Sequence, residues 1–214
     1  MRVGMPVYPQ VDVLDVAGPW EMLSWAGFDI TIAAQQAGRI VCRGGFLIEA
    51  ATSFADAPPF DILWVPGGAP ASLNTLMGDR AFLDYLIKCA ENAKYVCSVC
   101  EGALLLAATG MLDGHTITTH WAFEQCFIDK FPKVRLAPNH PSFWLDEKPL
   151  RGGQKLLTGG GIASGLEEAL ELIRLVKGED AAADARLTTQ FFPKAVASTI
   201  PANPPGCPLD PPKT

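Results

Sequence analysis

The chain has 214 residues, of which 49% are hydrophobic and 19% charged, so it can bury a sizeable core and does not have the composition of a disordered protein. A net charge of −6, with no cluster of Lys and Arg, argues against a nucleic-acid partner and against an anionic membrane surface. We find no apolar run of about 18 residues and no signal-peptide pattern, which predicts a protein of the cytoplasm without a membrane span.

The first half of the chain predicts strands that alternate with helices. Pro19 suits the first turn of a helix, which we expect to reach about Ala26. Two short apolar runs flank Gly44-Gly45 and predict a hairpin. The predicted strands are 2–7, 28–34, 40–42, 46–49 and 61–66, and a further helix is predicted over 79–92.

The second half continues the alternation as far as residue 190. Strands are predicted at 94–99, 116–118, 143–145 and 155–157, and helices at 102–109, 121–131, 162–177 and 180–187. We therefore expect one domain, 1–190, followed by a Pro-rich tail, 191–214. Seven of the 18 prolines lie from Pro193 onward, so regular structure is excluded there and the tail is either disordered or an extended strap.

This alternation predicts an α/β fold with a mostly parallel sheet and helices on both of its faces. Ligands of such sheets bind outside the carboxyl ends of the strands. Three turns rich in small residues follow predicted strands, and we expect them to converge at one site. They are Pro66-Gly67-Gly68, Cys100-Glu101-Gly102 and Gly159-Gly160-Gly161.

Cys100 lies at the centre of a pattern that is typical of a nucleophile elbow. In Ser98-Val99-Cys100-Glu101-Gly102, small residues stand two positions before and after the cysteine, between a predicted strand and a predicted helix. A helix N-terminus lowers the pKa of a cysteine and can hold a developing anion with its free N–H groups. We therefore predict a reactive thiolate; the alternative is a buried structural cysteine, which is how we interpret Cys97.

The six cysteines are expected to be reduced in a cytoplasmic protein. Cys97 and Cys100 have the spacing of half a zinc site, but a structural zinc would need a second ligand pair, and the three histidines are scattered. We therefore expect no structural zinc.

Longer motifs around these turns resemble the ThiJ/PfpI superfamily, and within it the bacterial isocyanide hydratases. The resemblance extends over roughly residues 1 to 190, and it implies a flavodoxin-like three-layer sandwich and a homodimer. The matching segments are Leu14-Asp15-Val-Ala-Gly-Pro19, Ala51-Thr-Ser-Phe-Ala-Asp56, Ile62-Leu-Trp-Val-Pro-Gly-Gly68, Ser98-Val-Cys-Glu-Gly102 with the helix after it, Thr118-Thr-His-Trp-Ala122 and Leu157-Thr-Gly-Gly-Gly-Ile162.

The resemblance implies a role for several residues. Cys100 would be the nucleophile and Asp15 its proton partner. Gly68 and Ala69, with the N–H of Glu101, would supply backbone donors for an oxyanion, and Ile162 would pack beside the thiol. The implied reaction adds water to an isocyanide, yields an N-substituted formamide and requires neither a metal nor an organic cofactor.

Other residues leave two interpretations open. Glu101 stands where isocyanide hydratases usually have Thr; it is either a second acid beside the thiol or a cap of the following helix, which we favour. His120 either approaches the thiol or is a satisfied core histidine, and Asp15 can also be a helix cap. Trp20 and Trp121 either line an apolar pocket or belong to the core.

Two other functions use the same cysteine. One is a glyoxalase-like activity on α-oxoaldehydes. The other is an oxidative-stress sensor, in which Cys100 is oxidised to sulfenic or sulfinic acid.

Overall fold

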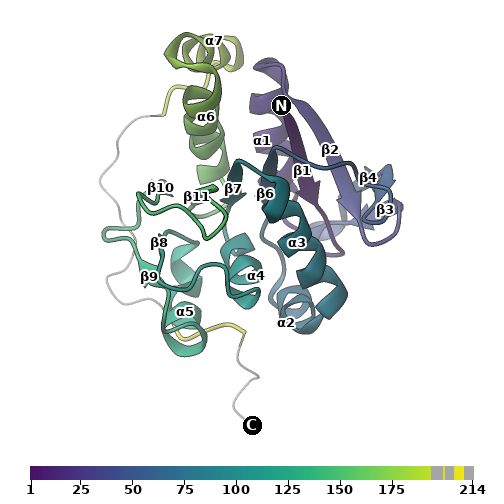
Figure 1. Cartoon of the computed structure of the whole chain (residues 1–214), viewed down its shortest axis with the longest axis vertical. Coiled ribbons are helices and arrows are strands. Elements are labelled where there is room, and N and C mark those ends of the chain that lie inside the picture. Colours follow the sequence, from purple (N-terminus) through teal and green to yellow (C-terminus); the bar gives the residue numbers. More distant parts are fainter. Residues whose placement is uncertain (194–199, 201–204, 210–214) are drawn as a thin grey trace.

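The computed structural model describes residues 1–193, 200 and 205–209 of the chain (Figure 1). Its centre is a seven-stranded sheet in the order β10-β11-β7-β6-β1-β2-β5. All neighbouring strands are parallel except β10, which runs antiparallel to β11. The strands are β1 (Arg2–Pro6), β2 (Asp29–Ala34), β5 (Thr52–Ser53), β6 (Ile62–Val65), β7 (Tyr95–Ser98), β10 (Phe143–Leu145) and β11 (Lys155–Gly159).

Two short pairs of strands lie outside this sheet. The predicted hairpin is confirmed as β3 (Gly38–Val41) and β4 (Leu47–Ala50), joined by the 3-10 turn η1 (Arg43–Gly45). The second pair, β8 (Thr116–Ile117) and β9 (Arg135–Leu136), is parallel.

Helices pack in two groups around the sheet, which confirms the flavodoxin-like α/β prediction. The helices α1 (Val13–Trp25), α6 (Ser164–Lys177) and α7 (Glu179–Thr189) contact one another, and α2 (Pro70–Gly78), α3 (Arg80–Asn92) and α4 (Gly102–Ala108) form the other group. The expected helix over 121–131 divides into a 3-10 turn, η2 (Trp121–Phe123), and α5 (Glu124–Lys130). Helix α2, whose first residue is a proline, was not predicted.

The prediction that the first helix begins at Pro19 is wrong. Helix α1 begins at Val13, and Pro19 lies inside it. Because a proline has no N–H, the carbonyl of Asp15, four residues earlier, receives no helical hydrogen bond from it. That carbonyl instead accepts a 3.1 Å hydrogen bond from the indole nitrogen of buried Trp64. Pro19 therefore helps to fix Asp15 against β6.

The strand register brings the predicted turns together. Val65 of β6 pairs with Ser98 of β7, which pairs in turn with Thr158 of β11, so the three strands end side by side. The expected convergence is confirmed by the backbone, since the N–H of Cys100 donates to the carbonyl of Gly160 at 2.8 Å.

We expect Gly102→Ala to lower the free energy of unfolding by about 3 kcal/mol. A Cβ at this position would overlap the backbone carbonyl of Val65, and backbone cannot move aside as a flexible side chain can. Gly78→Ala is the matched control, because a Cβ there meets no atom within 4 Å. Urea denaturation of the two variants checks the difference; equal stabilities would show that the elbow is not closely packed on β6.

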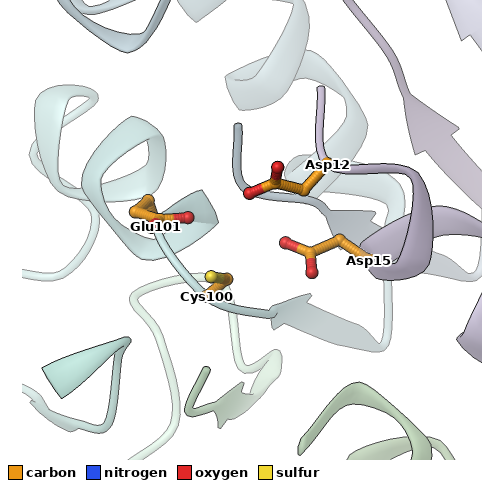
Figure 2. A group of neighbouring side chains, drawn as sticks. All are labelled: Asp12, Asp15, Cys100 and Glu101. Atoms are coloured by element: carbon orange, nitrogen blue, oxygen red, sulfur yellow. The ribbon is translucent and has the colours of Figure 1, made fainter. Parts of the chain in front are cut away.

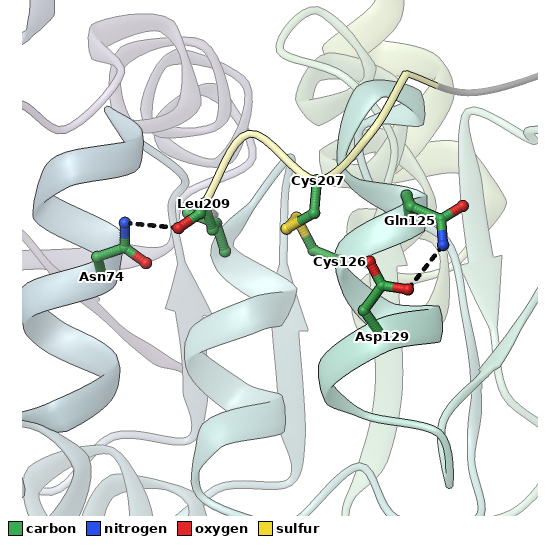
Figure 3. The surroundings of a disulfide bond; sticks show 6 residues. All are labelled: Asn74, Gln125, Cys126, Asp129, Cys207 and Leu209. Atoms are coloured by element: carbon green, nitrogen blue, oxygen red, sulfur yellow. Dashed lines mark hydrogen bonds between the residues drawn. A yellow bond between two sulfur atoms is a disulfide. The ribbon is translucent and has the colours of Figure 1, made fainter. Parts of the chain in front are cut away.

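The expectation that all six cysteines are reduced is wrong for two of them. Cys126 of α5 and Cys207 of the tail form a disulfide (Figure 3). Both Cys207 and Leu209 are buried, and the side chain of Asn74 in α2 donates to the Leu209 carbonyl at 3.2 Å. Residues 205–209 thus run from α5 to α2 as a strap without helix or strand, whereas 194–199, 201–204 and 210–214 lie outside the described residues.

In the described part of the chain, no helix is both long enough and apolar enough to cross a bilayer.

Candidate active site

Cys100 has the strained backbone of a nucleophile elbow. Its φ is +56°, which is uncommon for a residue with a side chain. Hydrogen bonds hold this conformation on both sides: the Cys100 N–H donates to Gly160, and the Thr119 hydroxyl donates to the Cys100 carbonyl at 2.8 Å. Thr119 was not predicted as a site residue, although it lies within the Thr118-Thr-His-Trp motif.

Three carboxyl groups surround the thiol. Asp12 precedes α1, Asp15 lies in the first turn of α1, and Glu101 follows Cys100. Figure 2 shows the two aspartates projecting towards the elbow, Asp15 from the first turn of α1 and Asp12 from the segment before it. One ligand atom from each of the four side chains lies within 4.8 Å of all the others. The exposed fraction is 0% for Asp15 and Cys100, 3% for Glu101 and 6% for Asp12, so the cluster is closed to solvent.

Asp15 is the most firmly held of these carboxyls. Its Oδ2 accepts a 2.8 Å hydrogen bond from the N–H of Gly67, and its carbonyl is fixed by Trp64. Burial, and then the nearby Glu101, raise the pKa of Asp15 well above its ordinary value. Asp15 therefore accepts a proton more readily than an ordinary carboxylate does, as a group that shuttles a proton must.

The prediction of a thiolate stabilised by the turn is wrong for this closed site. Burial, followed by the charges of Asp15 and Glu101, raises the pKa of Cys100 well above its ordinary value. The backbone N–H of Ile162 favours the ionised sulfur, but it opposes these effects only in part. The resting cysteine is a thiol, and its proton must leave as the sulfur attacks.

Glu101 is a second acid beside the thiol, and the helix-capping interpretation is wrong. It occupies the N-cap position of α4, yet its side chain makes no capping hydrogen bond. Its carboxyl lies instead near Gly67, where a Cβ would overlap it. Burial raises the pKa of Glu101 from 4.5 to about 7.

We expect Glu101→Gln to make the protein more stable than wild type above pH 7, by up to about 3 kcal/mol. Folded, Glu101 keeps its proton up to about pH 7, whereas the unfolded chain releases it near 4.5. The free energy of unfolding of wild type therefore falls as the pH rises through this window, and a glutamine removes that contribution. Urea denaturation at pH 5 and pH 8 measures the change, with Glu91→Gln, which removes an exposed carboxyl, as the control. Identical pH slopes for wild type and Glu101→Gln would contradict this expectation.

The predicted backbone donors differ in what they contact. The N–H of Ala69 donates to the Gln10 carbonyl at 2.9 Å and is already used. Gly68 has no such partner among the described residues, and it packs so closely on Tyr8 and Gln10 that a Cβ would lie 2.8 Å from the Gln10 carbonyl oxygen. The N–H of Glu101 interacts with the carboxyl of the same residue. Of the three predicted donors, Gly68 is therefore the one whose N–H has no hydrogen-bond acceptor among the described residues.

The remaining predicted residues differ in what they contact. Ile162 faces the sulfur with its N–H, and its side chain is 36% exposed. The His120 ring packs near Gly161, where a Cβ would lie 2.8 Å from Cδ2, and its Nδ1 accepts from the N–H of Ala122 at 3.2 Å. Trp20 is half-buried against the core, with no contact that places it at the thiol.

Two carboxyl residues and an arginine complete the surroundings of the thiol, and none of the three was predicted as a site residue. Asp12 lies 3.7 Å from the guanidinium of Arg43, which comes from η1 between β3 and β4. Burial raises the pKa of Asp12, and Arg43 partly opposes this. Glu168 of α6 is fully buried, its carboxyl lies against Gly159, and its pKa is raised by burial and then by Asp15. The spacing of Asp12 and Asp15, three residues apart at a helix start, was the available signal.

The model of the DJ-1/PfpI family matches residues 1–175. The chain belongs to the DJ-1/PfpI family. The resemblance to the ThiJ/PfpI superfamily is thereby confirmed, and the family match includes the elbow, both aspartates and Glu168.

Relatives within the DJ-1/PfpI family carry different names. An isonitrile hydratase of Pseudomonas putida is 34% identical over 194 residues, which cover 90% of this chain and 79% of the relative. A deglycase of Pyrococcus abyssi is 27% identical over 132 residues, 60% of this chain and 78% of the relative. Among solved structures, a ThiJ/PfpI family protein of Pseudomonas syringae has a TM-score of 0.79 at 26% identity and covers 91% of this chain and 76% of its own.

Proposed function

We propose that this protein hydrates an isocyanide to the N-substituted formamide, with Cys100 as the nucleophile and Asp15 as the proton shuttle. The observation that carries the proposal is a buried cysteine on a positive-φ elbow with a fixed carboxyl beside it. The similarity to isonitrile hydratase over 90% of the chain supports this choice of substrate. We further propose that the protein acts as a homodimer, needs no organic cofactor and binds neither nucleic acid nor membranes.

In the first step, the Cys100 thiol gives its proton to the Asp15 carboxylate while the sulfur attacks the terminal isocyanide carbon. The lone pair that develops on this carbon then takes the proton from Asp15. A C–S bond and a C–H bond have formed, and the product is a thioimidate, in which carbon is joined to nitrogen by a double bond. Because Asp15 returns the proton that it received, the thiol needs no low pKa before the substrate arrives.

In the second step, water adds to the thioimidate carbon and one proton of the water moves to nitrogen. The tetrahedral intermediate collapses to the formamide, the C–S bond breaks, and the sulfur regains a proton. The Gly68 N–H can stabilise negative charge on the water-derived oxygen, and the Ile162 N–H can stabilise the departing sulfur. The sum of both steps is one isocyanide and one water consumed for each formamide released.

Hydration of an aryl isocyanide, followed by absorbance and by mass spectrometry of the formamide, tests the proposal. The same protein is offered an α-oxoaldehyde, because a deglycase is among the relatives. Formamide production supports the hydratase proposal. If the protein converts the α-oxoaldehyde but not the isocyanide, the glyoxalase-like function takes the place of that proposal. The structure favours the sensor less, since oxidation requires an exposed thiolate and Cys100 is a buried thiol.

We expect Asp15→Asn to lower kcat for isocyanide hydration by about 10²-fold or more, the usual contribution of a positioned proton-transfer group. An asparagine can keep the contact with the Gly67 N–H through its amide oxygen, but it cannot carry the proton between sulfur and carbon. Steady-state kinetics measure the change, with Asp56→Asn, on the distant 53–56 turn, as the control. Full activity in Asp15→Asn would remove this residue from the mechanism.

A further inference from the structure

We propose that Asp12, Asp15, Cys100 and Glu101 form a binding site for a divalent zinc ion. This revises our expectation that the chain holds no metal, which considered only the spacing of cysteines and histidines. The proposal does not depend on the isocyanide reaction, because it concerns binding to the protein without substrate.

The spacing of the four side chains carries the first part of the argument. Their ligand atoms lie within 4.8 Å of one another. In a tetrahedral site with Zn–S of about 2.3 Å and Zn–O of about 2.0 Å, neighbouring ligand atoms are about 3.3 to 3.5 Å apart. The observed cluster therefore needs to contract by little more than about 1 Å, which side-chain rotation can supply.

The second part concerns oxygen atoms without partners. Oδ2 of Asp12, Oδ1 of Asp15 and Oε2 of Glu101 are buried and accept no hydrogen bond from an N–H or O–H group of the described residues. The only donor that the Asp15 and Glu101 side chains share in this part of the chain is the Cys100 thiol, which zinc binding would replace. Each side chain is more than nine-tenths buried. Figure 2 shows these carboxyls grouped around the sulfur. Buried acceptors without a donor are unfavourable, so a cation among them is stabilised by all three.

The donor set selects the metal. Magnesium and calcium take oxygen ligands, whereas a thiolate favours zinc among the common divalent ions without redox chemistry. Binding forms one Zn–S bond and three Zn–O bonds, and it releases to solvent the thiol proton together with any proton that the three carboxyls hold. Four anionic ligands leave the zinc complex with a net charge of −2, and the Arg43 guanidinium, 3.7 Å from Asp12, offsets part of it.

A zinc ion at this position would occupy the sulfur lone pair and the oxygen of Asp15. Zinc and isocyanide would thus compete for the same atoms, and the metal-bound protein would be unable to start the first step. Metal binding would then be a means of holding the enzyme inactive.

The test uses the metal-stripped whole chain and two probes. Zinc is titrated against a chromophoric chelator, and Co²⁺ is added as a spectroscopic substitute whose thiolate-to-metal absorption reports a Co–S bond. We expect one zinc per chain and a Co–S absorption that Cys100→Ser abolishes. Glu101→Gln and Asp12→Asn should each weaken zinc binding by at least about tenfold, since loss even of a group that only supports a ligand costs 10–100-fold.

Matched variants control for folding and for adventitious binding. Cys89→Ala removes a buried thiol of α3, and Glu91→Gln removes an exposed carboxyl of the same helix, so both should bind zinc as wild type does. Circular dichroism verifies that each variant is folded. No stoichiometric zinc, a Co–S absorption that persists in Cys100→Ser, or equal affinities for wild type, Glu101→Gln and Asp12→Asn would each overturn the proposal. Because the readouts are binding and absorption, they are independent of whether any isocyanide is hydrated.

Discussion

Cys100→Ala is expected to lower the rate of isocyanide hydration by at least about 10³-fold, because removal of a covalent nucleophile eliminates the pathway that it opens. An alanine fits the same buried position, and the hydrogen bonds from Cys100 to Gly160 and from Thr119 to Cys100 use only the backbone of residue 100. The elbow should therefore persist without its sulfur. Formamide formation under saturating isocyanide measures the loss.

The control for this experiment is Cys89→Ala, which removes a buried thiol from α3 and should leave the rate within about twofold of wild type. Mass spectrometry of the quenched reaction adds a second readout. Wild type should carry the mass of the thioimidate on the peptide that contains Cys100, whereas Cys100→Ala should carry none. Equal rates for wild type and Cys100→Ala would contradict the hydratase proposal. An adduct on another cysteine would show that this other residue, and not Cys100, is the nucleophile.

The second large effect concerns the disulfide. Removing it by Cys207→Ser should lower the free energy of unfolding by about 4 kcal/mol, the chain-entropy estimate for a closed loop of this size. The bond joins residues 81 positions apart and secures the strap against α5. A loss of this size corresponds to a fall in Tm of roughly 10 °C for a chain of this length.

Reduction provides the matched comparison. Under strong reducing conditions, wild type and Cys207→Ser should unfold at nearly the same temperature, and Cys126→Ser should match both. Calorimetry with and without reductant measures this convergence. If reductant leaves the Tm of wild type unchanged, the two cysteines are not joined in solution, and the earlier expectation of six reduced cysteines is restored.

Much of the fold could be predicted because its strands are short apolar runs that end at proline or glycine. Ile62–Val65 followed by Pro66-Gly67 is an example, and the structure places this strand in the middle of the sheet. The start of helix α1 was predicted too late in the chain, because the preference of proline for the first turn of a helix has exceptions. Here Pro19 lies inside the helix, where an indole N–H replaces the hydrogen bond that it cannot make. Helix α2 was missed because its nine residues show little contrast between an apolar and a polar face.

The candidate site was predicted in part. The elbow at Cys100 follows from a local pattern of small residues, which a sequence displays directly. The electrostatic state of the thiol could not be derived in this way, because it depends on Asp12 and Asp15, which the fold brings to the elbow from about 85 residues away in the chain. The same holds for the disulfide, since pairing Cys126 with Cys207 requires the path of the tail.

The burial of the four side chains around the sulfur also affects how a substrate binds. Cys100 has no exposed surface, so a substrate reaches the sulfur only in the fraction of molecules in which side chains have moved apart. If one molecule in a hundred were open, the apparent affinity would be about a hundredfold weaker than the intrinsic affinity. Narrow, rod-shaped groups need the smallest opening. An isocyanide has this shape, because its reacting carbon is the end of a linear C–N–C unit. The enzyme can therefore discriminate between substrates by the width of the reacting group before any bond is formed.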